Sequence, residues 1–256
     1  MFSRRTDVTI RAKFFTPAHR TKEDIRRIVM HTSEGLERAT GAEDLGHFFA
    51  NLPDSTPVAR RVSSHYGTDN NSVAGYVDET DIANHAFGDN PRSIGIEMVA
   101  RAAQKREDWN DDYSRDQLAL TAELCADICK RQGIPVRFLS DQDLRDNKSG
   151  FASHDAISRV FGDDIRDDPG KNFPWDKFLA DVKHILQGDD MIRFQLDSGE
   201  GEVLAQSSPV DEEFEQEQER LASFLTGLAG RDEMTAKIVR ETRDDRDVKI
   251  RRVQAD

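Results

Sequence analysis

Two apolar runs constrain the fold of this chain most strongly. A histidine directly follows the first run, where a buried strand would end, and a glutamate lies inside the second. The first run, Ile25–Met30, reads IRRIVM and leads directly into His31. The second run, Ser93–Val99, reads SIGIEMV and holds Glu97 within it. Short runs rich in branched apolar residues indicate buried strands. The second run is apolar enough to predict a central strand of a sheet.

A carboxylate inside a central strand must be paired or take part in chemistry, because burying an unpaired charge is costly. Two plainer interpretations stay open when the residues are taken singly. Glu97 can face solvent or form a salt bridge with an arginine, and His31 can be a strand-end histidine that caps a loop. The two positions become informative only when they are combined with the rest of the chain.

Three segments have the periodicity of amphipathic helices. The clearest is Asp116–Arg131, for which Ser114 is the expected N-cap and Gly133 the expected end. The segments Thr40–Asn51 and Trp175–Leu186 place apolar residues at the same helical spacing. We expect the helix at Asp116–Arg131 to cover one face of the sheet.

Further strands are expected on either side of a turn-rich GTDNNS sequence. Arg61–Tyr66 and Val73–Val77 flank this turn and predict an antiparallel pair. Together with the other runs, they place the chain in the α/β class. The predicted architecture is a central mixed sheet of about five or six strands, flanked by helices on both faces, with a small C-terminal appendage.

The N-terminal residues show no firm periodicity and the composition changes near residue 189, so the chain divides into three parts. We expect a lead-in at residues 1–24, the main domain at 25–188, and an acidic C-terminal module or interaction tail at 189–256. Met191–Leu196 and Glu202–Ala205 predict a strand pair within the tail. Apolar residues between Phe214 and Leu228 predict an amphipathic helix, which can dock on the main domain or support self-association.

Charge and composition exclude several classes of protein. The chain has 36 Lys and Arg against 49 Asp and Glu, a net charge of −13, which argues against a nucleic-acid partner because phosphate binding needs clustered cations. No run is long and apolar enough for a signal peptide or a membrane span, so we expect a protein that is cytoplasmic when synthesised. Cys125 and Cys129, four residues apart in a predicted helix, are expected to be buried apolar residues rather than a disulfide.

The stretch Gly150–Trp175 supplies two more side chains that can hold a metal. It contains His154 and then an Asp-Pro-Gly turn at Asp168. Two histidines and one carboxylate from separate places in the chain can occupy three corners of a zinc tetrahedron and leave the fourth for water. The sequence therefore suggests a zinc hydrolase, provided that the fold brings these residues together.

Six short motifs, taken in their order along the chain, resemble those of a known enzyme family. IVMHTS, VSSHY, ANHAF, SIGIEMV, SHDAIS and DDPGKNFPW resemble those of the zinc-dependent N-acetylmuramoyl-L-alanine amidases, which include muropeptide amidases, phage endolysins and peptidoglycan recognition proteins. The resemblance covers about Ile25 to Leu186. It implies a zinc enzyme that hydrolyses the amide bond between N-acetylmuramic acid and L-alanine in peptidoglycan or muropeptides.

The resemblance also implies a role for each matching residue. Glu97 corresponds to the catalytic carboxylate, and Arg166, where the family usually has lysine, corresponds to the residue that stabilises the oxyanion. Arginine keeps the charge but differs from lysine in reach and geometry. The implied zinc ligands are His31, His154 and Asp168. The implied substrate-binding residues are His85, Tyr66 and Asn172.

Several alternatives stay open at this point. A phage-type lysin, which would act on the cell wall after release, is favoured over a cytosolic muropeptide-recycling amidase. A peptidoglycan-binding module without turnover would need neither the three ligands nor Glu97. An assembly protein whose working part is residues 189–256 is a third alternative. Nucleophilic catalysis is disfavoured, because no serine or cysteine stands with a base and an orienting group at a recognisable spacing.

Overall fold

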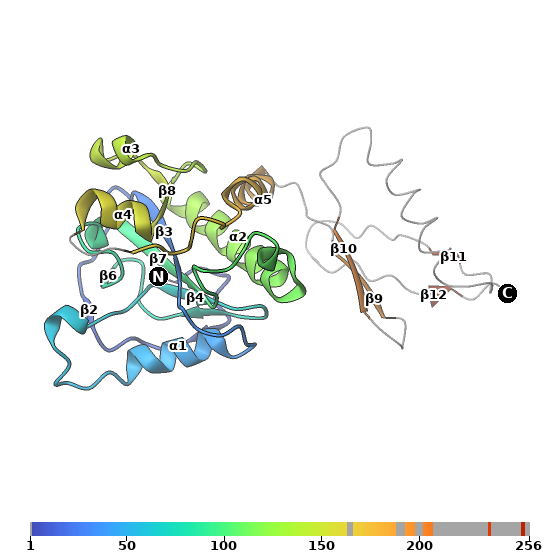
Figure 1. The fold of residues 1–256 in the computed structure, drawn as a ribbon, viewed down its shortest axis with the longest axis horizontal. Helices are drawn as coiled ribbons and strands as arrows, with labels where there is room; N and C mark the ends of the chain where they lie inside the picture. The colour runs from blue at the N-terminus through green and yellow to red at the C-terminus, as the bar shows by residue number, and fades with distance from the viewer. Residues whose placement is uncertain are drawn as a thin grey trace. The chain divides into compact units, whose positions relative to one another are not determined.

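The computed structural model describes residues 2–162 and 166–187, together with the backbone of four short strands further along the chain. The chain separates into two compact units, Met1–Leu186 and Gln187–Asp256 (Figure 1). The first unit holds every residue that the sequence motifs single out as catalytic, metal-binding or substrate-binding.

A six-stranded mixed sheet forms the centre of the first unit. Its inner strands β7 (Ser93–Met98) and β3 (Arg27–Thr32) run parallel. β8 (Gly150–Ser153) is parallel to β3, and β4 (Tyr66–Thr68) is parallel to β7. β4 and β5 form the antiparallel pair expected around the GTDNNS turn. The strand order is β1 (Val8–Thr9), β5 (Val73–Gly75), β4 (Tyr66–Thr68), β7 (Ser93–Met98), β3 (Arg27–Thr32) and β8 (Gly150–Ser153). A separate two-stranded sheet pairs β2 (Phe15–Thr16) with β6 (Ile82–Ala83).

Five α-helices and three short 3₁₀ helices accompany this sheet in the described part of the first unit. The α-helices are α1 (Gly41–Ala50), α2 (Asp112–Gln132), α3 (Asp141–Arg145), α4 (His154–Phe161) and α5 (Trp175–Gln187). The 3₁₀ helices are η1 (Val58–Arg60), η2 (Asn90–Arg92) and η3 (Asp108–Asn110). The predicted mixed α/β class is therefore confirmed.

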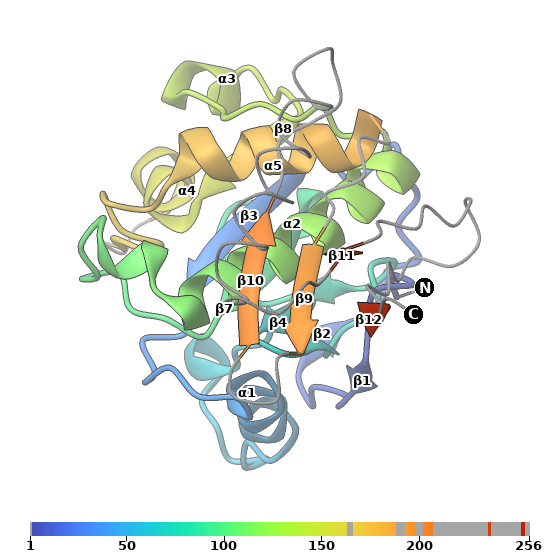
Figure 2. The same cartoon turned by 90° about the vertical axis from the view of Figure 1, so that its right-hand side faces the viewer.

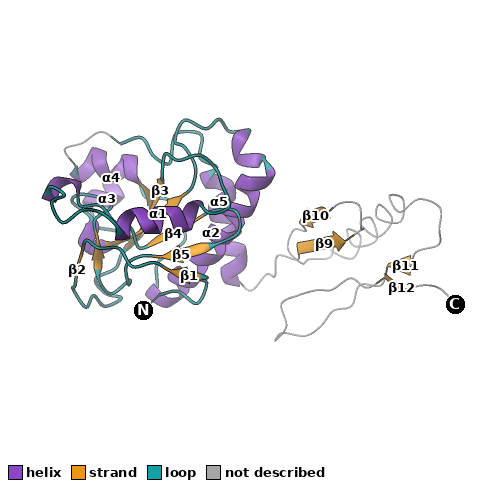
Figure 3. Cartoon of the chain, turned by 90° about the horizontal axis from the view of Figure 1, so that it is seen from below, coloured by secondary structure: helices purple, strands orange, loops and turns teal. Residues whose placement is uncertain are grey.

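The alternation of side chains along β3 separates the two faces of the sheet. Ile28 and Met30 join the large core beneath α2 and α5. Val29, between them, joins a second core with residues of α3 and α4. Helices therefore cover both faces of the sheet, as Figure 2 and Figure 3 show. His31, which follows Met30, must point to the α4 face.

Both ends of α2 have capping residues of the expected kind, but the N-cap is not the residue that was predicted. Asp111, rather than Ser114, is the N-cap, and its side chain accepts a hydrogen bond of 2.8 Å from the backbone N–H of Ser114. The prediction of Ser114 was wrong because the helix begins three residues earlier. Gly133 ends the helix as expected, with φ of 70° in the left-handed region that glycine adopts readily. Cys125 and Cys129 are buried free thiols in this helix.

The strand predicted at Arg61–Tyr66 is correct only in its last residue, since β4 begins at Tyr66. The backbone N–H of Ser63 bonds to the carbonyl of Asn84, which draws the preceding segment toward the loop after β6. The β-like composition of this segment reflects its burial, because Ser63, Ser64 and His65 are almost entirely shielded from solvent. The backbone N–H of His65 donates to the carbonyl of Gly95, and its carbonyl accepts from the N–H of Tyr76, so burial with partial backbone pairing produces the same sequence pattern as a strand.

The segment expected to be a lead-in belongs to the first unit. β1 lies beside β5 at one edge of the sheet. Arg20 is 7% exposed, and its guanidinium donates to the backbone carbonyls of Ser93 at 2.8 Å and Glu79 at 2.9 Å. The expected boundary at residue 24 therefore does not coincide with a boundary between compact units.

The second unit contains the strand pair expected from its sequence. β9 (Arg193–Asp197) and β10 (Glu202–Gln206) are antiparallel, and β11 (Thr235–Ala236) pairs with β12 (Arg252–Val253). The amphipathic helix predicted between Phe214 and Leu228 lies outside the described residues. Self-association through residues 189–256 accordingly stays a prediction. Among the helices that the structure describes, none has the length and apolar character required to cross a bilayer.

Candidate metal centre and active site

The register of the two inner strands brings His31 and Glu97 together. His31 of β3 is paired with Glu97 of β7, so the two side chains leave the sheet side by side on the same face. Both lie near the carboxyl ends of parallel strands, where ligand sites of open α/β sheets usually form. His31 is 2% exposed and Glu97 is partly buried. Two positions that stand far apart in the sequence thus become neighbours.

His154 and Asp168 reach the same place from the end of β8. Ser153 is the N-cap of α4 and accepts a hydrogen bond from the backbone N–H of Ala156, which fixes His154 as the first residue of the helix. The backbone N–H of Asp155 donates to the carbonyl of Asp168 at 3.1 Å. This hydrogen bond holds the two ligand-bearing segments together.

Gly170 allows the turn after Asp168 to pack closely. Its φ is 94°, a conformation that side chains with a Cβ rarely adopt. A Cβ at this position would also collide with the backbone carbonyl of Ala102. The backbone N–H of Gly170 donates to the carbonyl of Asp167 at 2.8 Å. Glycine at position 170 is therefore required by the path of the chain beside the metal-binding group.

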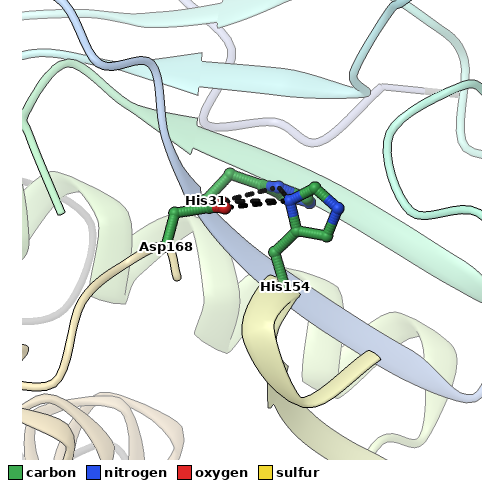
Figure 4. A group of neighbouring side chains, drawn as sticks. All are labelled: His31, His154 and Asp168. Atoms are coloured by element: carbon green, nitrogen blue, oxygen red, sulfur yellow. Dashed lines mark hydrogen bonds and ion pairs between the residues drawn. The ribbon is translucent and has the colours of Figure 1, made fainter. Parts of the chain in front are cut away.

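Three potential ligand atoms converge at this point (Figure 4). The Nδ1 atoms of His31 and His154 are 3.1 Å apart, and each lies 3.0 to 3.2 Å from a carboxylate oxygen of Asp168. A tetrahedral zinc ion with nitrogen ligands at about 2.0 to 2.1 Å separates its ligand atoms by about 3.3 Å. The spacing and the donor set of two imidazoles and one carboxylate therefore fit zinc.

The protonation states also suit metal ligands. Burial, together with the neighbouring His154, lowers the pKa of His31 to about 4, so its imidazole is neutral at neutral pH. Burial opposes ionisation of Asp168, but hydrogen bonds from His154 and His31 outweigh it and hold the pKa of this carboxyl below its usual range. Neutral imidazole and ionised carboxylate are the forms that bind a metal ion.

Glu97 has the properties of a general base. Burial raises the pKa of Glu97 to about 8, and the negative charges of Asp168 and Glu34 add to the shift. A carboxyl group whose pKa lies near the working pH can both accept and return a proton. The catalytic role of Glu97 stays a prediction, and its burial beside two acidic groups supports it.

Arg166 lies close enough to act on the site electrostatically. It is exposed and stands two positions before Asp168. Its positive charge adds to burial and His154 in lowering the pKa of His31. A guanidinium in this position supplies positive charge beside the metal-binding group, as an oxyanion-stabilising residue must.

The three residues expected to bind substrate have different surroundings. Tyr66 is fully buried and donates a hydrogen bond of 2.6 Å to Glu79, and its contact with substrate stays a prediction. Asn172 donates at 2.9 Å to the carbonyl of Gln104 and holds the turn after Asp168 in place, and its contact with substrate stays a prediction. The surroundings of the third, His85, differ again.

His85 contacts the candidate metal ligand His31 through one ring nitrogen. Its Nδ1 lies 3.0 Å from Nε2 of His31, and its Nε2 lies 3.2 Å from the hydroxyl of Ser93. Both ring nitrogens are thus engaged within the protein. The contact of His85 with substrate stays a prediction.

Sequence reasoning did not identify Glu34 or Ser93 as part of the site. The carboxylate of Glu34 accepts hydrogen bonds from the hydroxyl of Thr32 at 2.6 Å and from the backbone N–H of Ala102 at 2.9 Å. Glu34 stands three residues after His31, and Ser93 begins the strand that carries Glu97. Their proximity to recognised motifs was the available signal, but the contact of Glu34 with Ala102 joins residues that are distant in sequence.

Comparison with solved structures supports the same fold. The Staphylococcus aureus hydrolase AmiA, solved in complex with its ligand, is 17% identical over 72% of this chain and 84% of that chain, with a TM-score of 0.52. AmpD is 18% identical over 68% of this chain and 93% of that chain, with a TM-score of 0.48. An endolysin mutant from Bacillus subtilis is 16% identical over 69% and 99%, with a TM-score of 0.45. At these identities, the likeness to AmiA establishes the fold alone.

Sequence comparison identifies the family directly. A search of curated protein sequences returned no match. The profile of the Amidase_2 family, described as N-acetylmuramoyl-L-alanine amidase, matches residues 21–171, which is more than half of the chain. The matched region contains the three candidate metal ligands together with Glu97 and Arg166. This chain belongs to the N-acetylmuramoyl-L-alanine amidase family.

Proposed function

We propose that this chain carries out the reaction of its family with a zinc ion held by His31, His154 and Asp168. The observation that carries the proposal is the convergence of three ligand atoms, all within 4.8 Å of one another, beside a carboxyl group with a raised pKa. Zinc bound there supplies Lewis-acid polarisation of the amide carbonyl and activation of water at neutral pH. The remaining chemistry belongs to side chains of the protein.

Glu97 is the proton carrier in this proposal. The oxygen of water forms a bond to the lactyl carbonyl carbon of the muramic acid, while Glu97 accepts a proton from that water. The C–N bond to L-alanine then breaks, and Glu97 returns the proton to the leaving nitrogen. The products are a carboxylic acid on the muramic acid and a free amino group on the peptide. The raised pKa of Glu97, to about 8, supports both halves of this role.

Arg166 is the residue that stabilises negative charge on the carbonyl oxygen. Its guanidinium is exposed and is therefore reachable by a bound substrate. Its influence on the pKa of His31 supports its placement near the reacting atoms. A fixed charge where the oxyanion develops contributes typically about 3 to 4 kcal/mol to the stability of the transition state.

The substrate class is peptidoglycan or its muropeptide fragments, and the biological role is that of a lysin acting on the cell wall. Peptidoglycan as substrate agrees with the family to which the chain belongs. Lysis of the intact wall is the finer part of the proposal. Clearing of purified sacculi, compared with cleavage of small soluble muropeptides, distinguishes a lysin from a recycling amidase.

The test combines zinc content with amide cleavage in the wild type and the Glu97→Gln variant. Glutamine keeps the shape of the side chain but cannot carry the proton. We expect about one zinc per chain in both proteins from a tetrahedral site, and a fall of about 10²- to 10⁴-fold in the release of peptide from muropeptides for the variant. Wild-type turnover in Glu97→Gln would contradict the mechanism and assign the proton transfer to another group.

Histidine variants distinguish the specific loss of the metal site from a general loss of folded protein. His154→Ala should lose both zinc and cleavage, because it removes one of three ligands. His47→Ala, at an exposed position of α1, is the matched control and should keep both. A wild-type protein that binds peptidoglycan without cleaving it would instead support the binding-module alternative.

A further inference from the structure

The partly buried ring of His85 lies on the metal face of the sheet, over Gly95 of β7 and beside the ring of His31. The rings of His31 and His85 make an edge-to-face contact with centroids 5.1 Å apart. Gly95 of β7 makes the space for this ring, because a Cβ there would lie 2.5 Å from the ring atoms of His85. The glycine of the SIGIEMV strand thus permits a specific histidine–histidine contact.

The hydrogen bonds of the two rings are consistent with only one tautomer of each when His31 is a metal ligand. Nδ1 of His31 faces His154 and Asp168, so its lone pair must be directed at the metal and its proton must reside on Nε2. That Nε2–H then donates to Nδ1 of His85 at 3.0 Å. His85 consequently carries its own proton on Nε2.

The direction of donation continues beyond His85 to the backbone. Nε2–H of His85 donates to the hydroxyl of Ser93 at 3.2 Å, and that hydroxyl donates to the carbonyl of Asp89 at 2.9 Å. Ser93 and Asp89 are fully buried. The side chain of Asp89 forms a buried ion pair with Arg27, the first residue of β3. The hydrogen-bonded series therefore ends at the backbone carbonyl of Asp89, a residue whose side chain is itself held by the strand of His31.

The loop that carries His85 is held independently of the metal. The side-chain carbonyl of Asn90 accepts hydrogen bonds from the backbone N–H groups of His85, at 3.0 Å, and Ala86, at 2.6 Å. This pair of bonds fixes the backbone from which the imidazole projects. His85 is thus already placed to accept from His31 before any metal binds.

We propose that His85 is a positioning residue that accepts the Nε2–H of His31, and thereby holds the Nδ1 lone pair of His31 toward the zinc ion. The inference rests on the proposed zinc site. Hydrogen-bonded partners of metal-ligating histidines orient the ring and raise its basicity, and their loss typically costs about 10- to 100-fold in metal affinity. His85 touches neither the metal nor the substrate in this role.

The experiment compares His85→Leu with His85→Asn in the full chain. Leucine removes the acceptor, whereas the side-chain oxygen of asparagine is attached to Cγ as Nδ1 is in histidine and can accept the same proton. Zinc dissociation constants are measured by competition with a chromophoric chelator. We expect zinc binding about 10- to 100-fold weaker in His85→Leu, and binding restored to within a few-fold of wild type in His85→Asn.

His65→Leu is the matched control for the loss of a buried histidine. His65 is fully buried, and its ring lies beside that of His85 with centroids 5.5 Å apart. Nδ1 of His65 accepts from the backbone N–H of Gly95. This variant should be less stable than wild type, as judged by denaturant unfolding without metal, yet bind zinc with near-wild-type affinity.

A direct readout of the tautomer completes the test. In ¹⁵N spectra of the zinc-loaded wild type, we expect the ring proton of His31 on Nε2, with a hydrogen-bond coupling to Nδ1 of His85. Unchanged zinc affinity in His85→Leu, equal losses in His85→Leu and His85→Asn, or a proton on Nδ1 of His31 would overturn the inference. Absence of stoichiometric zinc binding by the wild type would overturn the proposed function as well, so the two failures are distinguishable.

Discussion

Glu97 illustrates how one residue acquires its chemistry from its surroundings. Its carboxyl group is partly buried next to Asp168 and Glu34, and these conditions favour the protonated form. An isolated glutamate on a solvated strand would be ionised throughout the neutral range. The same side chain here has a pKa of about 8 and can exchange a proton near neutral pH.

The raised pKa predicts how the stability of the metal-free protein depends on pH. Between the ordinary glutamate pKa of 4.5 and about 8, the folded chain keeps the proton of Glu97 while the unfolded chain releases it. The unfolded state then binds fewer protons, so the free energy of unfolding must fall as the pH rises through this window. The slope due to this one group is at most about 1.4 kcal/mol per pH unit.

Chemical unfolding of EDTA-treated wild type and Glu97→Gln at a series of pH values across this window measures the effect. Glutamine does not titrate, so the variant should lose less stability across the range and should gain on the wild type as the pH increases. Parallel stability curves for the two proteins would show that Glu97 has an ordinary pKa in the folded chain.

At the scale of elements, the junction between β8 and α4 delivers a ligand with the first residue of a helix. Ser153 ends the strand, caps the helix and directly precedes His154. Ser140 caps α3 in the same chemical way, through a capping box with Asp143. The helices that follow the two serines differ in one respect: α4 begins with a candidate metal ligand, and α3 contains none.

This difference gives a matched pair of substitutions. Ser153→Ala and Ser140→Ala should each lower the free energy of unfolding by about 1 kcal/mol, since each removes one side-chain cap. Only Ser153→Ala should also weaken zinc binding, because the cap fixes the backbone of His154. Unfolding experiments and chelator competition measure the two effects. Equal zinc affinities in the two variants would show that the cap does not position the ligand.

At the scale of the whole molecule, the two ends of the chain contribute differently to the amidase unit. The N-terminal segment supplies β1 and the buried Arg20. The guanidinium of Arg20 donates to the backbone carbonyls of Ser93, at the start of β7, and of Glu79. The C-terminal unit Gln187–Asp256 is compact separately from Met1–Leu186. The candidate catalytic and metal-binding residues all belong to the earlier unit.

Truncations should therefore have opposite outcomes. A chain that stops at Gln187 should keep its unfolding midpoint and cleave soluble muropeptides within a few-fold of the full chain. A chain that lacks residues 1–20 should be markedly less stable, because it loses an edge strand and four hydrogen bonds of one buried guanidinium. Thermal unfolding and cleavage assays check both, and loss of cleavage on C-terminal truncation would assign part of the site to the second unit.

The sequence alone was sufficient for the α/β class, for the helices α1, α2 and α5, for the inner strands β3 and β7, and for the candidate metal ligands. These depend on local patterns, such as the apolar runs that end at His31 and contain Glu97, and on the order of motifs. The same patterns placed the hairpin β9–β10 and the end of α2 at Gly133. Local periodicity and turn chemistry act over a few residues, so they can be recognised in the sequence without knowledge of the fold.

Only the tertiary structure decided how the remaining residues of the site are used. His85 and Tyr66 stand in motifs of similar character, yet one ring bonds to His31 while the other is fully buried against Glu79. The pairing of β3 with β7 and the absence of a Cβ at Gly95 determine that outcome. Contacts between residues far apart in the sequence depend on strand register and packing, and no local pattern in the sequence encodes them.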